Sequence, residues 1–111
     1  RNFHGVTKAW HIHRVQVDWW YCPLGNLKVA LYDTRPDSPT HRHLMELYLG
    51  DNYPAVVVRI PPGVAHGYKV LSAEAHMLYI TSRTYDPADE GRIPYDDPGI
   101  GYDWLEGHKI T

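Results

Sequence analysis

The sequence predicts an all-β protein, a sandwich or small barrel of antiparallel strands. Short runs that alternate or are continuously apolar are separated by Gly, Pro, Asp and Asn, and no segment keeps a long helical period. Many short strands joined by regular turns are typical of sandwiches and small barrels. Because 43% of the 111 residues are hydrophobic, the chain can bury one modest core. We therefore expect residues 1–111 to form a single domain.

Seven strands are expected, with bounds set by the alternation and by the turn residues between the runs. They are residues 6–13, 18–24, 27–33, 43–49, 55–60, 64–70 and 76–82. In the first strand, alternation puts Trp10 and Ile12 on one face and His11 and His13 on the other. The later stretch 85–103 is rich in Asp, Pro, Gly and Tyr, and we interpret it as an irregular, ordered surface segment.

Composition and charge exclude several classes of protein. The net charge of -2 argues against nucleic acid as a partner, since neutralising phosphates requires a basic patch. No apolar run is long enough to cross a bilayer, so no membrane partner is expected. Cys22 is the one cysteine and is expected to be a small buried hydrophobe. A signal peptide removed before Arg1 would leave no trace in this sequence. We therefore expect the compartment from the substrate: the protein is secreted if it acts on a polysaccharide and cytoplasmic if it acts on a nucleotide sugar.

Two motifs combine His with Gly at fixed spacing: Gly5-x5-His11-x-His13-x4-Asp18-x6-Gly25 and Pro61-x-Gly63-x2-His66. They resemble the two signatures of the cupin superfamily, whose first motif usually has Glu where this chain has Asp18. The resemblance implies a cupin-type jelly roll, which is a double-stranded β-barrel.

Four side chains of these motifs are candidate ligands for one metal ion: His11, His13, Asp18 and His66. The two imidazoles of a His-x-His strand share a face, Asp18 is expected on the adjoining strand, and His66 comes from a distant strand. Three neutral imidazoles and a carboxylate suit a divalent transition metal. Gln16 is the substitute if Asp18 does not reach, and three His with water are an equally viable set. Copper is favoured if Asp18 stays outside the shell, and iron or manganese if it coordinates.

Further motifs between Lys8 and Trp104 are similar to those of dTDP-4-dehydrorhamnose 3,5-epimerases, a cupin family that acts on nucleotide sugars. They are Asp33-x-Arg35-x2-Ser38-Pro39-Thr40, Ile60-Pro61-x-Gly63-x-Ala65-His66-Gly67, Leu71-Ser72, Leu78-Tyr79, Tyr85-x-Pro87 and Asp97-x2-Ile100-Gly101-x-Asp103-Trp104. The resemblance implies a metal-free reaction in which a His base and a Tyr acid move protons beside a sugar ketone. It matches His11 to the base, Tyr79 to the acid, and His66 and Tyr85 to pocket positions.

The chain departs from that family in its first motif. His13 stands where the family has Gln, and Asp18 stands where it has an active-site Lys. A carboxylate there would repel the enolate that a Lys stabilises. The family's C-terminal Asp, which pairs with the base, has no visible counterpart. Because both replacements introduce metal ligands, we favour a metal site.

Three functions follow from these observations. The preferred hypothesis is a mononuclear metal-dependent oxidoreductase acting on a carbohydrate, similar to small copper cupins that cleave cellulose oxidatively. The aromatic residues that would stack on glucan rings are Trp10, Trp19, Trp20, Tyr21 and Trp104. Packing in the core or in a homodimer, which the resemblance to cupins implies, would explain them equally well. The alternatives are a nucleotide-sugar epimerase that uses His11 and Tyr79, and a non-catalytic sugar-binding cupin.

Overall fold

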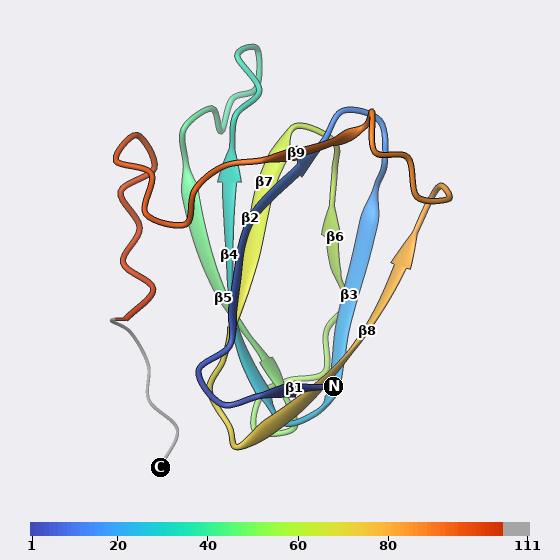
Figure 1. The fold of residues 1–111 in the computed structure, drawn as a ribbon, viewed down its shortest axis with the longest axis vertical. Helices are drawn as coiled ribbons and strands as arrows, with labels where there is room; N and C mark the ends of the chain where they lie inside the picture. The colour runs from blue at the N-terminus through green and yellow to red at the C-terminus, as the bar shows by residue number, and fades with distance from the viewer. Residues whose placement is uncertain (106–111) are drawn as a thin grey trace.

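A computed structural model describes residues 1–105, whose strands form two antiparallel sheets that face each other (Figure 1). The smaller sheet has the order β1-β8-β3-β6 and the larger the order β5-β4-β7-β2-β9. The strands are β1 (Asn2–Phe3), β2 (Thr7–His13), β3 (Asp18–Leu24), β4 (Asn26–Asp33), β5 (Leu44–Gly50), β6 (Val58–Ile60), β7 (Val64–Val70), β8 (Glu74–Thr81) and β9 (Glu90–Arg92). The described residues contain no helix that could cross a membrane. The all-β, double-sheet architecture expected from the sequence is confirmed.

The seven expected strands all form, and two short strands were missed. The expected strand 55–60 begins only at Val58, because residues 55–57 pair with no neighbour. The missed strands are β1 and β9, with two and three residues. Segments this short carry no periodicity of their own. β9 lies within the stretch that we interpreted as irregular and exists because it pairs with β2.

The main core fills the space between the two sheets. Its fully buried members include Leu27 and Val29 of β4 and Val70 of β7. Cys22 also belongs to this core, as expected of a small buried hydrophobe, and burial raises the pKa of its thiol. A core shared by both sheets fixes the distance between the walls of the barrel.

A second cluster covers the outer face of the larger sheet, where the chain after β9 folds back over the strands (Figure 1). Trp10 and Trp104 are 1% and 4% exposed, with ring centroids 5.2 Å apart. Lys28 is buried beneath them, and its Nζ and that of Lys69 both donate to the Trp104 carbonyl oxygen at 3.1 Å. The expectation that Trp10 and Trp104 stack on a glucan is therefore wrong, because packing occupies both rings.

The Asp33 carboxylate organises the loop between β4 and β5. It accepts hydrogen bonds from Arg35 Nε at 2.9 Å, from Ser38 Oγ at 2.6 Å and from Thr40 Oγ1. The Arg35 guanidinium, together with these hydroxyls, holds the pKa of Asp33 far below its usual range. This part of the epimerase-like motif therefore acts as a structural element of the loop.

An extra residue in β2 changes which side chains of that strand face the interior. Lys8 pairs with Tyr68 and His11 with His66, so three steps along β2 match two along β7. Such a bulge reverses the alternation, and Lys8 therefore faces the same side as His11. Gly67 makes room for the bulge, since a Cβ there would lie 2.5 Å from the Cβ of Ala9.

Gly5 and Gly25 have the same backbone conformation but different surroundings. Substituting each by Ala therefore distinguishes the free-energy cost of a positive φ from the cost of a steric clash. Gly5 and Gly25 both have φ near +81°, but an added Cβ meets nothing within 4 Å at Gly5 and overlaps the Glu74 carbonyl oxygen at Gly25. We expect Gly5→Ala to lower the free energy of unfolding by about 1–2 kcal/mol. Gly25→Ala is expected to lose about 1–3 kcal/mol more through overpacking. Urea denaturation measures both, and equal losses would contradict the assigned close approach.

Candidate functional site

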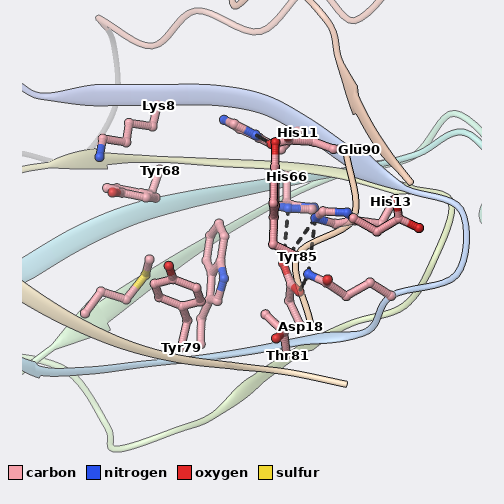
Figure 2. Close-up of a pocket in the computed structure, with 14 residues that line it drawn as sticks. Lys8, His11, His13, Asp18, His66, Tyr68, Tyr79, Thr81, Tyr85 and Glu90 are labelled. Carbon is pink, nitrogen blue, oxygen red and sulfur yellow. Dashed lines mark hydrogen bonds and ion pairs between the residues drawn. The ribbon is translucent and has the colours of Figure 1, made fainter. Parts of the chain in front are cut away.

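A cavity of about 380 Å³ lies between the two sheets (Figure 2). The larger sheet contributes β2 and β7 to its walls, and the smaller sheet contributes β3 and β8. The lining residues are Lys8, His11, His13, Gln16, Asp18, Trp20, His66, Tyr68, Met77, Tyr79, Thr81, Tyr85, Asp86 and Glu90. All expected catalytic residues and all expected metal ligands thus line one pocket.

His11 is held by strand pairing and by a carboxylate. It pairs directly with His66 across β2 and β7, while β9 pairs with the other edge of β2. This places the Glu90 Oε1 atom 3.1 Å from the His11 Nδ1 atom, with the Glu90 side chain only 18% exposed. A carboxylate accepts the Nδ1 proton and leaves Nε2 of the imidazole as a proton acceptor.

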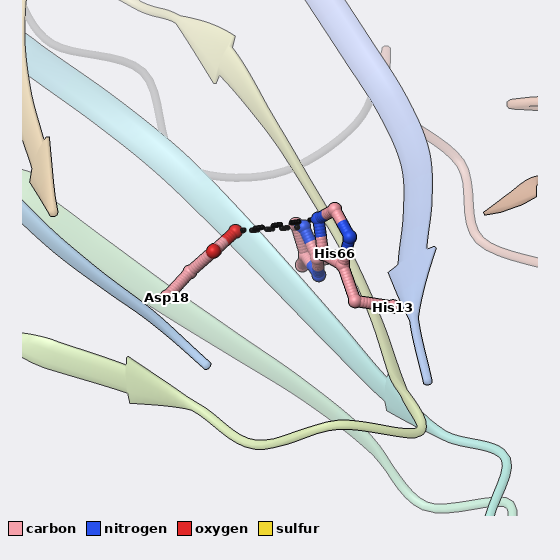
Figure 3. A group of neighbouring side chains, drawn as sticks. All are labelled: His13, Asp18 and His66. Carbon is pink, nitrogen blue, oxygen red and sulfur yellow. Dashed lines mark ion pairs between the residues drawn. The ribbon is translucent and has the colours of Figure 1, made fainter. Parts of the chain in front are cut away.

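His13, Asp18 and His66 meet deeper in the pocket (Figure 3). One ligand atom from each residue lies within 4.8 Å of the others. Asp18 Oδ2 is 3.5 Å from His66 Nε2 and 3.7 Å from His13 Nε2. We expected Asp18 on the strand adjoining β2. It lies instead on β3 of the opposite sheet and reaches across the pocket.

Two other expected ligands lie outside this group of three. His11 pairs with Glu90 instead. Gln16 is a partner of Asp18 and not its substitute, because its Nε2 donates to Asp18 Oδ1 at 2.6 Å. The four-residue set that the spacing predicts therefore forms only in part.

His66 is neutral and has a defined tautomer. It is 3% exposed, and its Nδ1 lies 3.0 Å from the Val64 carbonyl oxygen, which can only accept a hydrogen bond. Burial lowers the pKa of His66 to about 4, against the opposing effects of Val64 and Asp18. Near neutral pH the proton is therefore on Nδ1, and the Nε2 lone pair faces Asp18.

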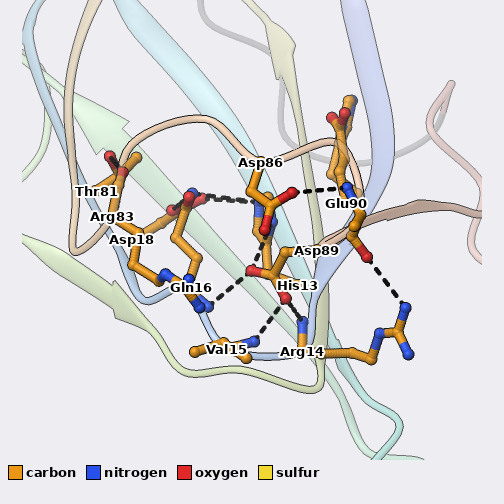
Figure 4. A network of polar contacts seen from close by, with 12 residues as sticks. His13, Arg14, Val15, Gln16, Asp18, Thr81, Arg83, Asp86, Asp89 and Glu90 are labelled. Carbon is orange, nitrogen blue, oxygen red and sulfur yellow. Dashed lines mark hydrogen bonds and ion pairs between the residues drawn. The ribbon is translucent and has the colours of Figure 1, made fainter.

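Asp89 attaches the segment before β9 to the barrel (Figure 4). Its carboxylate accepts backbone hydrogen bonds from Arg14, Val15 and Gln16 at 2.9, 2.9 and 3.0 Å. Burial by itself would raise the pKa of Asp89, but these three donors and then His13 outweigh it, and the pKa is lowered. The attachment places Tyr85, Asp86 and Glu90 in the pocket wall.

The sequence did not predict the roles of Lys8, Glu90 and Asp89. The bulge in β2 turns Lys8 inward, and nothing in the spacing indicates the bulge. Glu90 and Asp89 lie in a stretch that shows no periodicity. The one feature of the sequence that could have indicated these two residues is that Asp89 and Glu90 are adjacent acids.

The five aromatic residues expected on a glucan surface do not share a surface. Trp20 lines the pocket, and Trp10 and Trp104 are packed outside the barrel. Trp19 and Tyr21 alternate with Trp20 along β3 and therefore point to the other face of the sheet.

Comparison with known proteins gives the family. The family model for dTDP-4-dehydrorhamnose 3,5-epimerase matches residues 1–111. The chain belongs to this family. It is 43% identical over 107 residues to the spore coat polysaccharide biosynthesis protein SpsL of Bacillus subtilis, covering 94% of this chain and 70% of SpsL.

Solved structures of the family have the same fold. A dTDP-sugar isomerase from Desulfovibrio desulfuricans superposes with a TM-score of 0.88 at 28% identity, covering 96% of this chain and 68% of its own. A 3,5-epimerase from Legionella pneumophila in complex with dTDP-4-keto-L-rhamnose gives 0.82 at 30% identity, covering 98% and 58%. The cupin-type jelly roll is thereby confirmed. The homodimer and the single-domain boundary stay predictions.

The preferred functional hypothesis is wrong. The family consists of sugar-nucleotide epimerases and isomerases that act without a metal cofactor, so an oxidoreductase that cleaves cellulose with copper, iron or manganese is not supported. The chemistry explains why no metal is needed, because the sugar ketone itself acidifies the neighbouring C–H bonds. His13, Asp18 and His66 therefore require an explanation other than a resident metal ion.

The low pKa of Asp89 predicts how stability depends on pH. A lowered pKa contributes stability above the unfolded-state value, and this contribution is lost as the pH falls through the folded-state value. We expect the free energy of unfolding to fall less between about pH 6 and about pH 3 in Asp89→Asn than in the wild type. Urea denaturation at each pH measures the difference. The exposed Asp37, mutated as Asp37→Asn, should keep the wild-type slope, and an unchanged slope in Asp89→Asn would contradict the role of Asp89.

Proposed function

We propose that the chain is a nucleotide-sugar epimerase that inverts the configuration beside the ketone of a dTDP-4-keto-6-deoxy sugar. The observation that carries this proposal is that a histidine and a tyrosine, suited to act as base and acid, lie on opposite walls of one pocket. His11 comes from β2 of the larger sheet and Tyr79 from β8 of the smaller sheet (Figure 2). Inversion requires a proton to leave one face of the carbon and another to arrive on the opposite face.

In the proposed mechanism, His11 is the base. Glu90 accepts the Nδ1 proton, and Nε2 takes the proton from the carbon beside the ketone. Tyr79, whose side chain faces the pocket from the other sheet, gives a proton to the opposite face. Solvent can return the proton to Tyr79, because the residue is 61% exposed.

Lys8 supports a nucleotide sugar as the substrate. It is the one lysine or arginine that lines the pocket within residues 1–105. An ammonium group on a flexible chain suits a diphosphate as a point charge. In Figure 2 Lys8 lies beside Tyr68, well apart from Asp18. We therefore place the diphosphate at the Lys8 end and the sugar towards the histidines.

The proposal is tested by incubating the protein in D₂O with dTDP-4-keto-6-deoxy-D-glucose. Deuterium should enter the carbons beside the ketone, as measured by mass spectrometry and proton NMR. His11→Gln should lower the rate about 100- to 10,000-fold, which is the usual contribution of a general base. Absence of incorporation by the wild type would contradict the proposed function.

Tyr79→Phe should separate exchange from inversion. His11 can still remove a proton and return a deuteron on the same face, so incorporation should continue. Delivery to the opposite face should fall about 100-fold or more. Proton NMR distinguishes the two products, and equal loss of exchange and inversion would assign Tyr79 a different role.

Glu90→Gln tests the positioning of the base. An amide can donate to Nδ1 and favour the wrong tautomer, so we expect kcat to fall about 10- to 100-fold with KM within about twofold. Asp86→Asn removes another carboxylate of the same wall and should leave kcat nearly unchanged. A rise in KM at constant kcat would show that Glu90 binds substrate instead.

A further inference from the structure

Asp18 is a buried carboxylate with an incomplete set of partners. Its side chain is 7% exposed, and Gln16 donates to Oδ1 at 2.6 Å. The Nε2 atoms of His66 and His13 lie 3.5 and 3.7 Å from Oδ2, beyond an ordinary hydrogen bond. No lysine or arginine of residues 1–105 forms an ion pair with it. A buried carboxylate is costly without a donor or a cation, so Oδ2 is open to a ligand in the pocket.

The atoms around this position are hydrogen-bond acceptors. The proton of His66 is on Nδ1, so Nε2 offers a lone pair. The Nδ1 atom of His13 faces the Asp89 carboxylate, with Oδ2 at 3.9 Å, whereas the Gln16 amide nitrogen lies 3.5 Å from Nε2, too far to occupy its lone pair. This arrangement favours the proton of His13 on Nδ1 and a lone pair on Nε2. Three acceptors therefore surround one point in the pocket.

An ammonium group fits such a set of acceptors. The three atoms lie within 4.8 Å of one another, so a nitrogen between them can approach each to about 2.8 Å, a normal hydrogen-bond distance. An ammonium donates three hydrogen bonds and carries the positive charge that would balance the Asp18 carboxylate. A hydroxyl donates only one hydrogen bond and carries no charge. The same geometry explains why the sequence motif resembled a metal site, because a metal cation and an ammonium ion both need converging lone pairs.

The two ends of the pocket carry opposite charges. Lys8 lies at one end, and Asp18 lies at the other with His13 (Figure 2). A diphosphate at the Lys8 end directs the sugar towards Asp18. Complementary charges on substrate and pocket give specificity.

We propose that His13, Asp18 and His66 form an ammonium subsite, so that the preferred substrate is a nucleoside-diphosphate 4-keto sugar with an amino group on its ring. This inference rests on the proposed function and names the substrate class. Asp18 is then the residue that sets specificity for the amino group.

Three stable probes without a ketone test the subsite by calorimetry. They are dTDP-6-deoxy-D-glucose and its counterparts in which an amino group replaces the 2- or the 3-hydroxyl, the two ring positions that stay free in a 4-keto sugar. We expect one amino probe to bind about 10- to 100-fold more tightly than the hydroxyl probe, as for a charge-assisted contact. Asp18→Asn should reduce the preference to about twofold or less, while Asp86→Asn, which removes another carboxylate that lines the pocket, should retain it.

The inference is overturned if neither amino probe binds more tightly, or if the preference survives Asp18→Asn. If Asp18→Asn does not fold, the affinities of the wild type for the amino and hydroxyl probes decide the question. Deuterium incorporation into the parent 4-keto sugar is measured separately. Deuterium incorporation without a preference for an amino probe would contradict the ammonium subsite and support the proposed epimerase. A preference without incorporation into any 4-keto sugar would support the subsite and remove the epimerase.

Discussion

The pairing of β2 with β7 on one edge and β9 on the other is the constraint on which the site depends. It sets His11 beside His66 and brings Glu90 within 3.1 Å of the His11 Nδ1 atom. The single extra residue in β2 then adds Lys8 to the same face. One strand therefore supplies the proposed base and the proposed diphosphate contact. Its neighbours supply the carboxylate that orients the base and the buried imidazole of His66.

The smaller sheet completes the site from the opposite side. It contributes Tyr79 and Asp18, and the core between the sheets holds these residues at a fixed separation from β2. A barrel suits the proposed chemistry because a sugar held between two walls can lose a proton to one wall, and the planar enolate so formed can gain a proton from the other. Asp18 adds a buried acceptor to this arrangement.

The stretch from residue 85 to residue 105 links stability to function. Asp89 attaches its first part to the turn at residues 14–16, and Glu90 follows directly in the pocket wall. Its last part covers Trp10 and Lys28 on the outside of the larger sheet. Loss of this stretch would therefore expose apolar surface and release the carboxylate that orients His11.

The sequence by itself determined the all-β class, seven of the strands and the inward orientation of His11 and His13. Local alternation encodes these features, because side chains in a strand point to opposite faces in turn. Spacing also selected Asp18 and His66, but it could not distinguish a metal ion from another cation, since both require the same lone pairs. Only the tertiary structure decided that Glu90 pairs with His11, that Lys8 turns inward and that Trp10 packs outside the barrel. Each of these depends on a partner strand or segment far away in the chain, and no local pattern records such a partner.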